Sequence, residues 1–389
     1  MRKIYWIFIL GFIIISCKEK YTPKITTPVS GFLVVEGIIN AGDGPTVMHL
    51  SRASGLDSVR TIYENGAEIE VQSSDGASYP LAEQGNGTYT ISQVPVLQNQ
   101  QYRLHIRTSA GGEYLSDFVD VKISPPIDSV SWEATQEQVR IDVTTHDANK
   151  NSVYYQWEYE ETWKYVSAFQ SEFIVDSFAK DKYRVIARPD SLKRPFTCWR
   201  TDTSTRIIIA SSAKLYEDVI AQFPVTLIPF SASNRLIQRY TIKVKQYVLA
   251  KDGYEWKQKV QKNTEQLGSI FDAQPSETGG NIHSVTNPAE RVIGFIGCSS
   301  FTEKRIFIDN AQLPPVTVNT GYQDCEQVSR SLFEKYNPLP DLYEQPNDFA
   351  ISGVTRNSAD VIDSVKVTPM ECVDCRLRGG VDYPPPFWQ

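Results

Sequence analysis

The sequence predicts a mainly β protein, and two observations carry that prediction. Short runs of β-branched and aromatic residues follow one another along most of the 389 residues, separated by Gly, Asn and Asp. Several runs alternate apolar and polar residues, as in QYRLHIRT, where Tyr102, Leu104 and Ile106 share one face. We therefore expect an N-terminal immunoglobulin-like antiparallel sandwich, then a larger β-sandwich domain with two covering helices, and an irregular C-terminal tail.

The first residues have the layout of an export signal. Arg2 and Lys3 precede the apolar run 4–15, and Ser16 and Cys17 follow it. The run is shorter than the roughly 20 apolar residues of a membrane-spanning helix, so we predict a signal peptide over residues 1–16. The end of the run, IISC, resembles the lipobox of bacterial lipoproteins. That resemblance implies that Cys17 becomes a lipidated N-terminus and that residues 17–30 form a lipidated tether.

The composition is that of an ordinary globular protein. It is 41% hydrophobic and 22% charged, with a formal net charge of −7, so the chain can bury a core in each of two or three domains. The mild acidity provides no basic stripe that could follow a phosphate backbone. We therefore expect no nucleic-acid partner.

The expected first domain covers residues 31–124. Asn86-Gly87 and Gly111-Gly112 supply the positive-φ residues that tight hairpins require. Pro125 and Pro126 then interrupt the series of strands, because proline cannot donate a backbone hydrogen bond. We place the first domain boundary at this pair.

The expected second domain covers residues 125–320 and contains longer strands. Leu215, Val219 and Phe223 have helical spacing, with Ser212 as a possible N-cap, and this predicts a helix near 213–223. A weaker apolar stripe predicts a second helix near 253–266. Residues 321–389 are rich in Pro and Cys and are expected to form an irregular tail, ordered only if its aromatics dock or its cysteines form bridges.

The exported chain retains five cysteines besides Cys17, and an odd number leaves at least one unpaired: Cys198, Cys298, Cys325, Cys372 and Cys375. The Cys372-x-x-Cys375 spacing is compatible with a zinc site, a redox-active pair or structural disulfides. It lacks the strand-then-helix context of a redox motif, and no usual zinc spacing completes it. We favour structural disulfides, with Cys325 as the partner of one of the pair.

No catalytic, cofactor or metal site emerges from the residue pattern, so we expect a protein that is not an enzyme. The four histidines do not form a metal-binding motif, and the segment around Cys298 lacks the G-x-S-x-G elbow of hydrolases. Glu158 and Glu160 share a strand face with Gln156. A solvated face explains these acids better than a glycosidase pair.

Three residues are candidates for ligand binding. Asn281 and His283 lie in the Gly-rich segment 276–287, and binding groups tend to concentrate in such loops. Trp256 can stack on a sugar, although sandwich cores use the same aromatic residues. Four serines lie in Asp-Ser-aliphatic tripeptides, which resemble the sequence on which Bacteroidota attach O-glycans: Ser58, Ser129, Ser191 and Ser364.

Longer phrases occur in chain order: LVVEG near the mature start, GTYTI, QYRLHI, PPIDSV, ERVIGFIG, KRIFI and CVDCRLRGG. Together with the lipobox they resemble the Bacteroidota surface lipoprotein family called domain of unknown function 4249. Members are often encoded beside TonB-dependent outer-membrane transporters of the SusC type.

The resemblance implies a lipid-anchored, surface-exposed protein of the outer membrane. Its expected role is that of an accessory binding or assembly partner of a SusC-like transporter, or of other envelope proteins, in nutrient uptake or envelope assembly. The alternative is an autonomous surface lipoprotein that binds a glycan or peptide without a transporter partner.

We predict that Cys17 carries the lipid. Replacing it by Ala (Cys17→Ala) removes the thiol that accepts diacylglycerol, so incorporation of labelled palmitate into the protein should be lost and the chain should leave the membrane fraction. Metabolic labelling followed by immunoprecipitation measures this. Full labelling of the variant would contradict the prediction.

Overall fold

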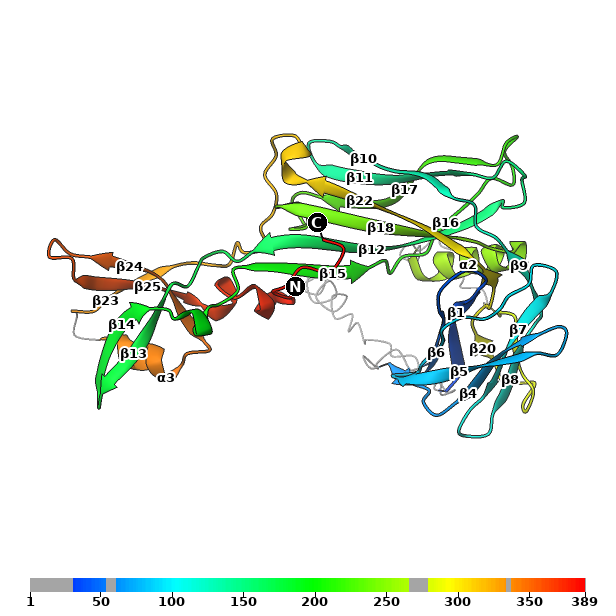
Figure 1. Ribbon diagram of the computed structural model, residues 1–389, viewed down its shortest axis with the longest axis horizontal. Coiled ribbons are helices and arrows are strands. Elements are labelled where there is room, and N and C mark those ends of the chain that lie inside the picture. The colour runs from blue at the N-terminus through cyan, green and yellow to red at the C-terminus, as the bar shows by residue number, and fades with distance from the viewer. Residues whose placement is uncertain (1–30, 54–60, 266–278, 334–336, 389) are drawn as a thin grey trace, which may run out of the picture.

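The computed structural model describes residues 31–53, 61–265, 279–333 and 337–388. It is mainly β, as the sequence predicts, and its described residues form four sheets. Figure 1 shows three parts along the long axis: a β-barrel-like N-terminal part, a central pair of sheets, and a small distal sheet. No helix in the described ranges is long and apolar enough to cross a membrane.

The N-terminal part is a closed ring of eight strands. Backbone pairing runs in the order β7, β4, β5, β6, β2, β1, β21 and β9, and β9 pairs back with β7. The ring strands are β1 (Leu33–Asn40), β2 (Thr46–Arg52), β4 (Glu68–Ser73), β5 (Ser78–Gly85), β6 (Thr88–Ile91), β7 (Gln101–Arg107), β9 (Val119–Lys122) and β21 (Cys298–Ser299). The rim adds β3 (Ile62–Tyr63), β8 (Glu113–Ser116), β19 (Ile282–Ser284) and β20 (Val292–Ile293).

The structure does not confirm an immunoglobulin-like sandwich in this part. The ring closes because β21 inserts, parallel to both neighbours, between β1 and β9. A closed ring removes the exposed edges that separate sheets would leave. The residues that close the ring lie within the range 125–320, which the sequence assigns to the second domain. They are distant in the sequence from the strands that they join, so the local sequence pattern does not predict the closure.

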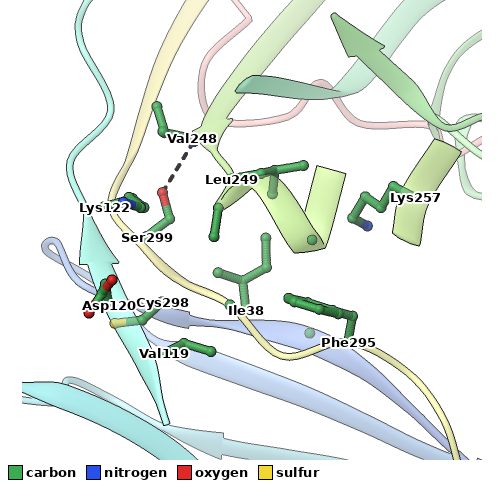
Figure 2. A pocket seen from close by; sticks show the side chains of 14 residues that line it. Ile38, Val119, Asp120, Lys122, Val248, Leu249, Lys257, Phe295, Cys298 and Ser299 are labelled. Atoms are coloured by element: carbon green, nitrogen blue, oxygen red, sulfur yellow. Dashed lines mark hydrogen bonds between the residues drawn. The ribbon is translucent and has the colours of Figure 1, made fainter. Parts of the chain in front are cut away.

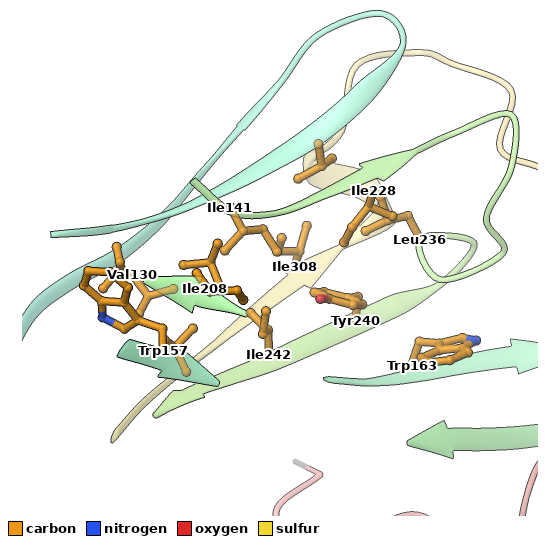
Figure 3. Close-up of a cluster of buried hydrophobic side chains, with 14 of the residues drawn as sticks. Val130, Ile141, Trp157, Trp163, Ile208, Ile228, Leu236, Tyr240, Ile242 and Ile308 are labelled. Atoms are coloured by element: carbon orange, nitrogen blue, oxygen red, sulfur yellow. The ribbon is translucent and has the colours of Figure 1, made fainter. Parts of the chain in front are cut away.

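The central part consists of two sheets around one core. A three-stranded sheet contains β10 (Ile127–Ala134), β11 (Gln138–His146) and β17 (Val219–Pro229). A five-stranded sheet contains β15 (Thr197–Thr203), β12 (Tyr154–Val166), β18 (Arg239–Val248) and β22 (Phe301–Asp309), with β16 (Ile208–Ser211) also paired to β12. Figure 3 shows Ile141 of the first sheet facing Trp157 and Ile242 of the second, and all three are fully buried.

Only one of the two predicted helices of the second domain forms. Helix α2 (Lys251–Glu265) confirms the helix expected near 253–266. The helix expected near 213–223 is wrong, because Leu215 and Tyr216 are 55% and 91% exposed in a turn and β17 begins at Val219. Pairing of β17 with β11 satisfies the backbone in place of a helix, and the Asp218 carboxylate accepts from the Tyr155 hydroxyl at 3.0 Å.

The expectation of an irregular C-terminal tail is also wrong. A five-stranded sheet in the order β14, β13, β24, β25 and β23 joins residues from both halves of the chain. Its elements are β13 (Phe173–Ala179), β14 (Lys182–Ala187), β23 (Val328–Ser331), β24 (Phe349–Arg356) and β25 (Ile362–Pro369), with helix α3 (Leu339–Glu344) packed on one face. Strand β24 pairs with the edge of the β13–β14 hairpin, with Phe173 opposite Ile351. Because the two strands are far apart in the sequence, the local pattern does not predict this pairing.

The last residues lie against the outer face of the five-stranded central sheet. Trp388 packs edge to face on Trp199 and Phe307, with ring centres 6.3 Å and 6.1 Å away. The Arg305 guanidinium lies 3.7 Å from the centre of the Phe387 ring. Short 3₁₀ turns complete the fold: η1 (Asp190–Leu192), η2 (Asn310–Gln312), η3 (Met370–Cys372) and η4 (Cys375–Arg378).

Two disulfides hold the C-terminal segment, which confirms the expectation of structural bridges. Cys198 pairs with Cys375 and Cys325 pairs with Cys372, so the two cysteines of the C-x-x-C bond to different distant partners. Cys298 is the unpaired cysteine of the described residues and is buried.

We predict that the double substitution Cys325→Ser and Cys372→Ser lowers the free energy of unfolding by about 2–4 kcal/mol, because the unfolded chain regains the entropy of a large loop. Chemical denaturation of the oxidised protein measures this. The matched control is Cys298→Ala, which removes a thiol without removing a bridge or burying a new polar group. An unchanged midpoint in the double variant would contradict the prediction.

Candidate functional site

A cleft of about 840 Å³ lies where the N-terminal barrel meets the outer face of the central sheet. Strands β1 and β2 provide one side, and β12, β18 and β22 provide the floor. Helix α2 and the loop between β15 and β16 complete the walls. The volume is within the range of about 300–1,000 Å³ that is usual for small-molecule sites.

The floor carries charges of both signs in neighbouring rows. Glu160 on β12 is opposite Lys243 on β18 in the strand register, and Glu158 is opposite Lys245. The Lys243 ammonium lies 3.9 Å from the Glu160 carboxylate, and just beyond the cleft Arg305 reaches the same carboxylate at 3.1 Å. The acidic run that the sequence suggests is a solvated face is therefore the charged floor of a cleft.

Glu161, the next residue of that run, faces the opposite way. Its carboxylate lies in the core, 3.1 Å from Arg235 and 2.8 Å from the Tyr240 hydroxyl that donates to it. Burial raises the pKa of Glu161, and Arg235 and the hydroxyl oppose that rise. The strand alternation thus separates a structural acid from the two acids of the cleft.

The aromatic rings of the cleft are packed against other groups of the protein. The Lys245 ammonium lies 4.2 Å from the centre of the Phe301 ring, and the Tyr247 ring packs on Phe301 with centres 6.0 Å apart. Trp256 packs on Phe295 at 6.1 Å. Flat ring faces that could stack on a sugar are therefore partly occupied.

Polar groups without partners gather where α2 crosses β12. Gln156 is only 5% exposed; its Nε2 donates to Glu158 at 2.9 Å, but its Oε1 has no partner within the described ranges. The buried Nε1 of Trp256 also lacks an acceptor there. An unpaired buried polar atom costs about 1–3 kcal/mol, so two of them on one cleft call for an explanation.

Lys257 stands beside these two groups on α2. No carboxylate of the described chain lies within 4.0 Å of its ammonium. Burial lowers the pKa of Lys257, and the charges of Glu158 and Glu36 partly oppose that decrease. The cleft wall therefore holds a cation that lacks a close counter-ion.

The walls are held by specific contacts. The Ile207 backbone N–H donates to Glu265 at 2.7 Å, and Gln261 donates to the Ile207 carbonyl at 2.7 Å, which ties the β15–β16 loop to α2. Gly253 permits the close approach of α2 to Phe295, since a Cβ at this position would lie 2.9 Å from the ring. The cleft is thus formed before a ligand arrives.

A second, small cavity of about 50 Å³ lies beneath α2 (Figure 2). Cys298 and Phe295 line it, and Lys257 lines both this cavity and the cleft. Burial raises the pKa of Cys298 to about 12, so the thiol remains protonated and is a poor nucleophile.

The three residues predicted to bind ligand have different surroundings. Trp256 lines the cleft, whereas Asn281 and His283 do not. The buried Asn281 amide holds Ile296, donating to its carbonyl at 2.9 Å and accepting from its N–H at 2.8 Å. His283 is exposed on β19, 3.3 Å from Asp117. Sequence reasoning missed Gln156 and Lys257, because only the folded arrangement brings them to one surface.

The remaining predicted positions are placed as follows. Ser191 is exposed in η1, whereas Ser129 and Ser364 are half-buried in β10 and β25. Cys17 and Ser58 lie outside the described residues. Within the part of the chain that the structure describes, no group of three or more His, Cys, Asp or Glu side chains could hold a metal ion.

We predict opposite outcomes for the two loop candidates. Asn281→Ala leaves the Ile296 N–H and carbonyl buried without partners, so the free energy of unfolding should decrease by about 1–3 kcal/mol. The exposed His283→Ala should change it by less than about 0.5 kcal/mol. Thermal and chemical denaturation compare the two variants, and equal effects would contradict this assignment.

Comparisons with known proteins add the family but not an activity. No curated protein matches the chain. Three solved structures show low similarity. The chitinase ChiA74 from Bacillus thuringiensis is 10% identical over 49% of this chain and 30% of that chain, with a TM-score of 0.16, and the Yersinia pseudotuberculosis adhesin InvE is 13% identical over 56% of this chain and 55% of that chain, with a TM-score of 0.15. A DUF3823 family protein from Bacteroides ovatus is 14% identical over 56% of this chain and 90% of that chain, with a TM-score of 0.12. The chain thus spans 30% and 55% of the length of the first two, and TM-scores this low carry no functional inference. Residues 18–305, most of the chain, match the family described as domain of unknown function (DUF4249), and the protein belongs to that family.

Proposed function

We propose that this protein is a lipid-anchored binding protein of the outer-membrane surface and an accessory partner of a TonB-dependent, SusC-like transporter. The observation that carries the binding role is the preformed cleft of about 840 Å³, which contains unpaired polar groups. The cleft lies between two units, the N-terminal barrel that β21 closes and the central pair of sheets, which we treat as separate domains.

The contents of the cleft favour binding over catalysis. Glu160 is held by Lys243 and Arg305, so its carboxylate is already engaged in ion pairs within the protein. His49 lines the rim and contacts the Thr88 hydroxyl at 3.1 Å. A nucleophile paired with a base is the usual feature of covalent catalysis; the exposed contact of His49 with Thr88 is a pair of this kind, but Thr88 does not line the cleft.

The lipid anchor supports the location. The family match begins at residue 18, directly after the lipobox cysteine Cys17. A protein anchored through two or more acyl chains remains on the membrane stably, so it can present the cleft near a transporter. The transporter partner itself rests on the association of this family with SusC-type genes.

We predict that an amine-reactive, membrane-impermeant cross-linker applied to intact cells joins the tagged protein to a TonB-dependent transporter. Mass spectrometry of the purified cross-linked species identifies the partner. Cys17→Ala should abolish the cross-link because the protein leaves the membrane, and Cys298→Ala should retain it. Cross-linked species without any outer-membrane transporter would contradict the partnership.

A second candidate function is an autonomous surface binder of a glycan or peptide. The cleft favours it, because its volume lies in the range that is usual for ligand sites. This candidate would be supported over the first if the purified chain binds a ligand and the protein in intact cells cross-links to no transporter.

A further inference from the structure

Three groups at the inner end of the cleft have complementary hydrogen-bonding roles. Gln156 Oε1 can accept, Trp256 Nε1 can donate, and Lys257 is a cation without a close carboxylate among the residues that the structure describes. They form one neighbourhood: the Lys257 ammonium lies 6.0 Å from the centre of the Trp256 ring, and Glu158 both binds the Gln156 amide and influences Lys257. All of them line the same open cleft.

An acceptor, a donor and a cation together match the end of a polypeptide. A backbone amide presents one N–H and one carbonyl, and the terminal carboxylate presents the negative charge. Lysine binds carboxylates as a compact point charge. Both polar atoms are closed to solvent in the unliganded structure, so a ligand at this end would satisfy them once the two side chains rotate toward it, and it would give Lys257 a counter-ion.

The rest of the cleft favours a peptide over a glycan. A row of acidic side chains on β12 lies beside a row of basic side chains on β18, so peptide side chains of either sign find a partner, as in Glu158 opposite Lys245. The Phe301 ring is covered by Lys245, which leaves less flat aromatic surface for a sugar.

We propose that the cleft binds peptides by their carboxyl-terminal end, with the carboxylate at Lys257 and the last amide between Gln156 and Trp256. This inference rests on the proposed binding function and specifies its ligand. The floor of β12 and β18 receives the preceding side chains, and the wall formed by α2 and the β15–β16 loop sets where the peptide ends.

The test uses the full-length lipidated protein in detergent and two synthetic hexapeptide libraries, one with free carboxyl termini and one with the same sequences amidated. A panel of neutral and acidic oligosaccharides is assayed in parallel. Retained molecules are quantified by mass spectrometry. We expect at least about tenfold greater retention of free-acid peptides than of their amides.

Variants separate the roles of the residues. Lys257→Met should abolish the preference for free-acid peptides, and Lys257→Arg should keep it because the charge remains. Gln156→Leu should weaken retention of both libraries. The matched control is Lys259→Met, an exposed lysine on the same helix, which should behave like the unmodified protein. Melting temperatures verify that each variant is folded.

Several results would overturn the inference: equal retention of acids and amides, retention of oligosaccharides alone, a preference that survives Lys257→Met, or no retention of any probe. If binding fails while the transporter still cross-links in cells, the partnership stands and only the peptide assignment falls. If peptides bind as predicted but no transporter cross-links, the cleft assignment stands without the partnership.

Discussion

The arrangement of the whole molecule depends on the return of residues 298–299 to the N-terminal sheet. Strand β21 fills the gap between β1 and β9, and the chain then passes within two residues into β22, an edge of the central sheet. Ser299 accepts from the Val248 N–H at 3.2 Å, and Ser300 accepts from the Ser124 N–H at 2.9 Å. The same short segment therefore closes the barrel and fastens it to the sheet, and the cleft exists because the two are fixed side by side.

Two glutamines show how the protein treats buried polar groups. Gln246, on the inner face of β18, accepts from the Trp157 Nε1 at 2.9 Å and donates to the Pro125 carbonyl at 3.0 Å. Gln156, on the outer face of β12, leaves its Oε1 unpaired. A buried amide is tolerated when its hydrogen bonds are complete, and the incomplete amide at the cleft is the one that the proposed peptide would complete.

The outer face of the central sheet is covered at both ends. Helix α2 and the barrel cover one end, and Phe387 and Trp388 of the C-terminal segment cover the other. The bridges of Cys372 and Cys375 hold this segment in place. Between the two covers lies the charged floor of the cleft, which is the stretch of the sheet that the proposed ligand would contact.

The sequence by itself determined the mainly β class, the helix of residues 251–265 and the need for disulfides in the C-terminal region, because these follow from local periodicity, capping and cysteine content. The alternation at Tyr102, Leu104 and Ile106 is visible in the residues and survives in β7, where all three are buried. The sequence also identified Trp256 as a candidate ligand-binding residue, because it is an aromatic residue on a predicted helix, and it lines the cleft.

Only the tertiary structure decided the barrel closure, the strand in place of a helix from Val219, and the distal sheet that the C-terminal residues share with β13. Each depends on hydrogen bonds between segments far apart in the chain, which leave no local pattern. The same holds for the cleft: Gln156 and Lys257 are ordinary surface-type residues in the sequence. They become a candidate site because the fold brings the buried Gln156 beside the half-buried Lys257, and neither has a complete set of partners among the described residues.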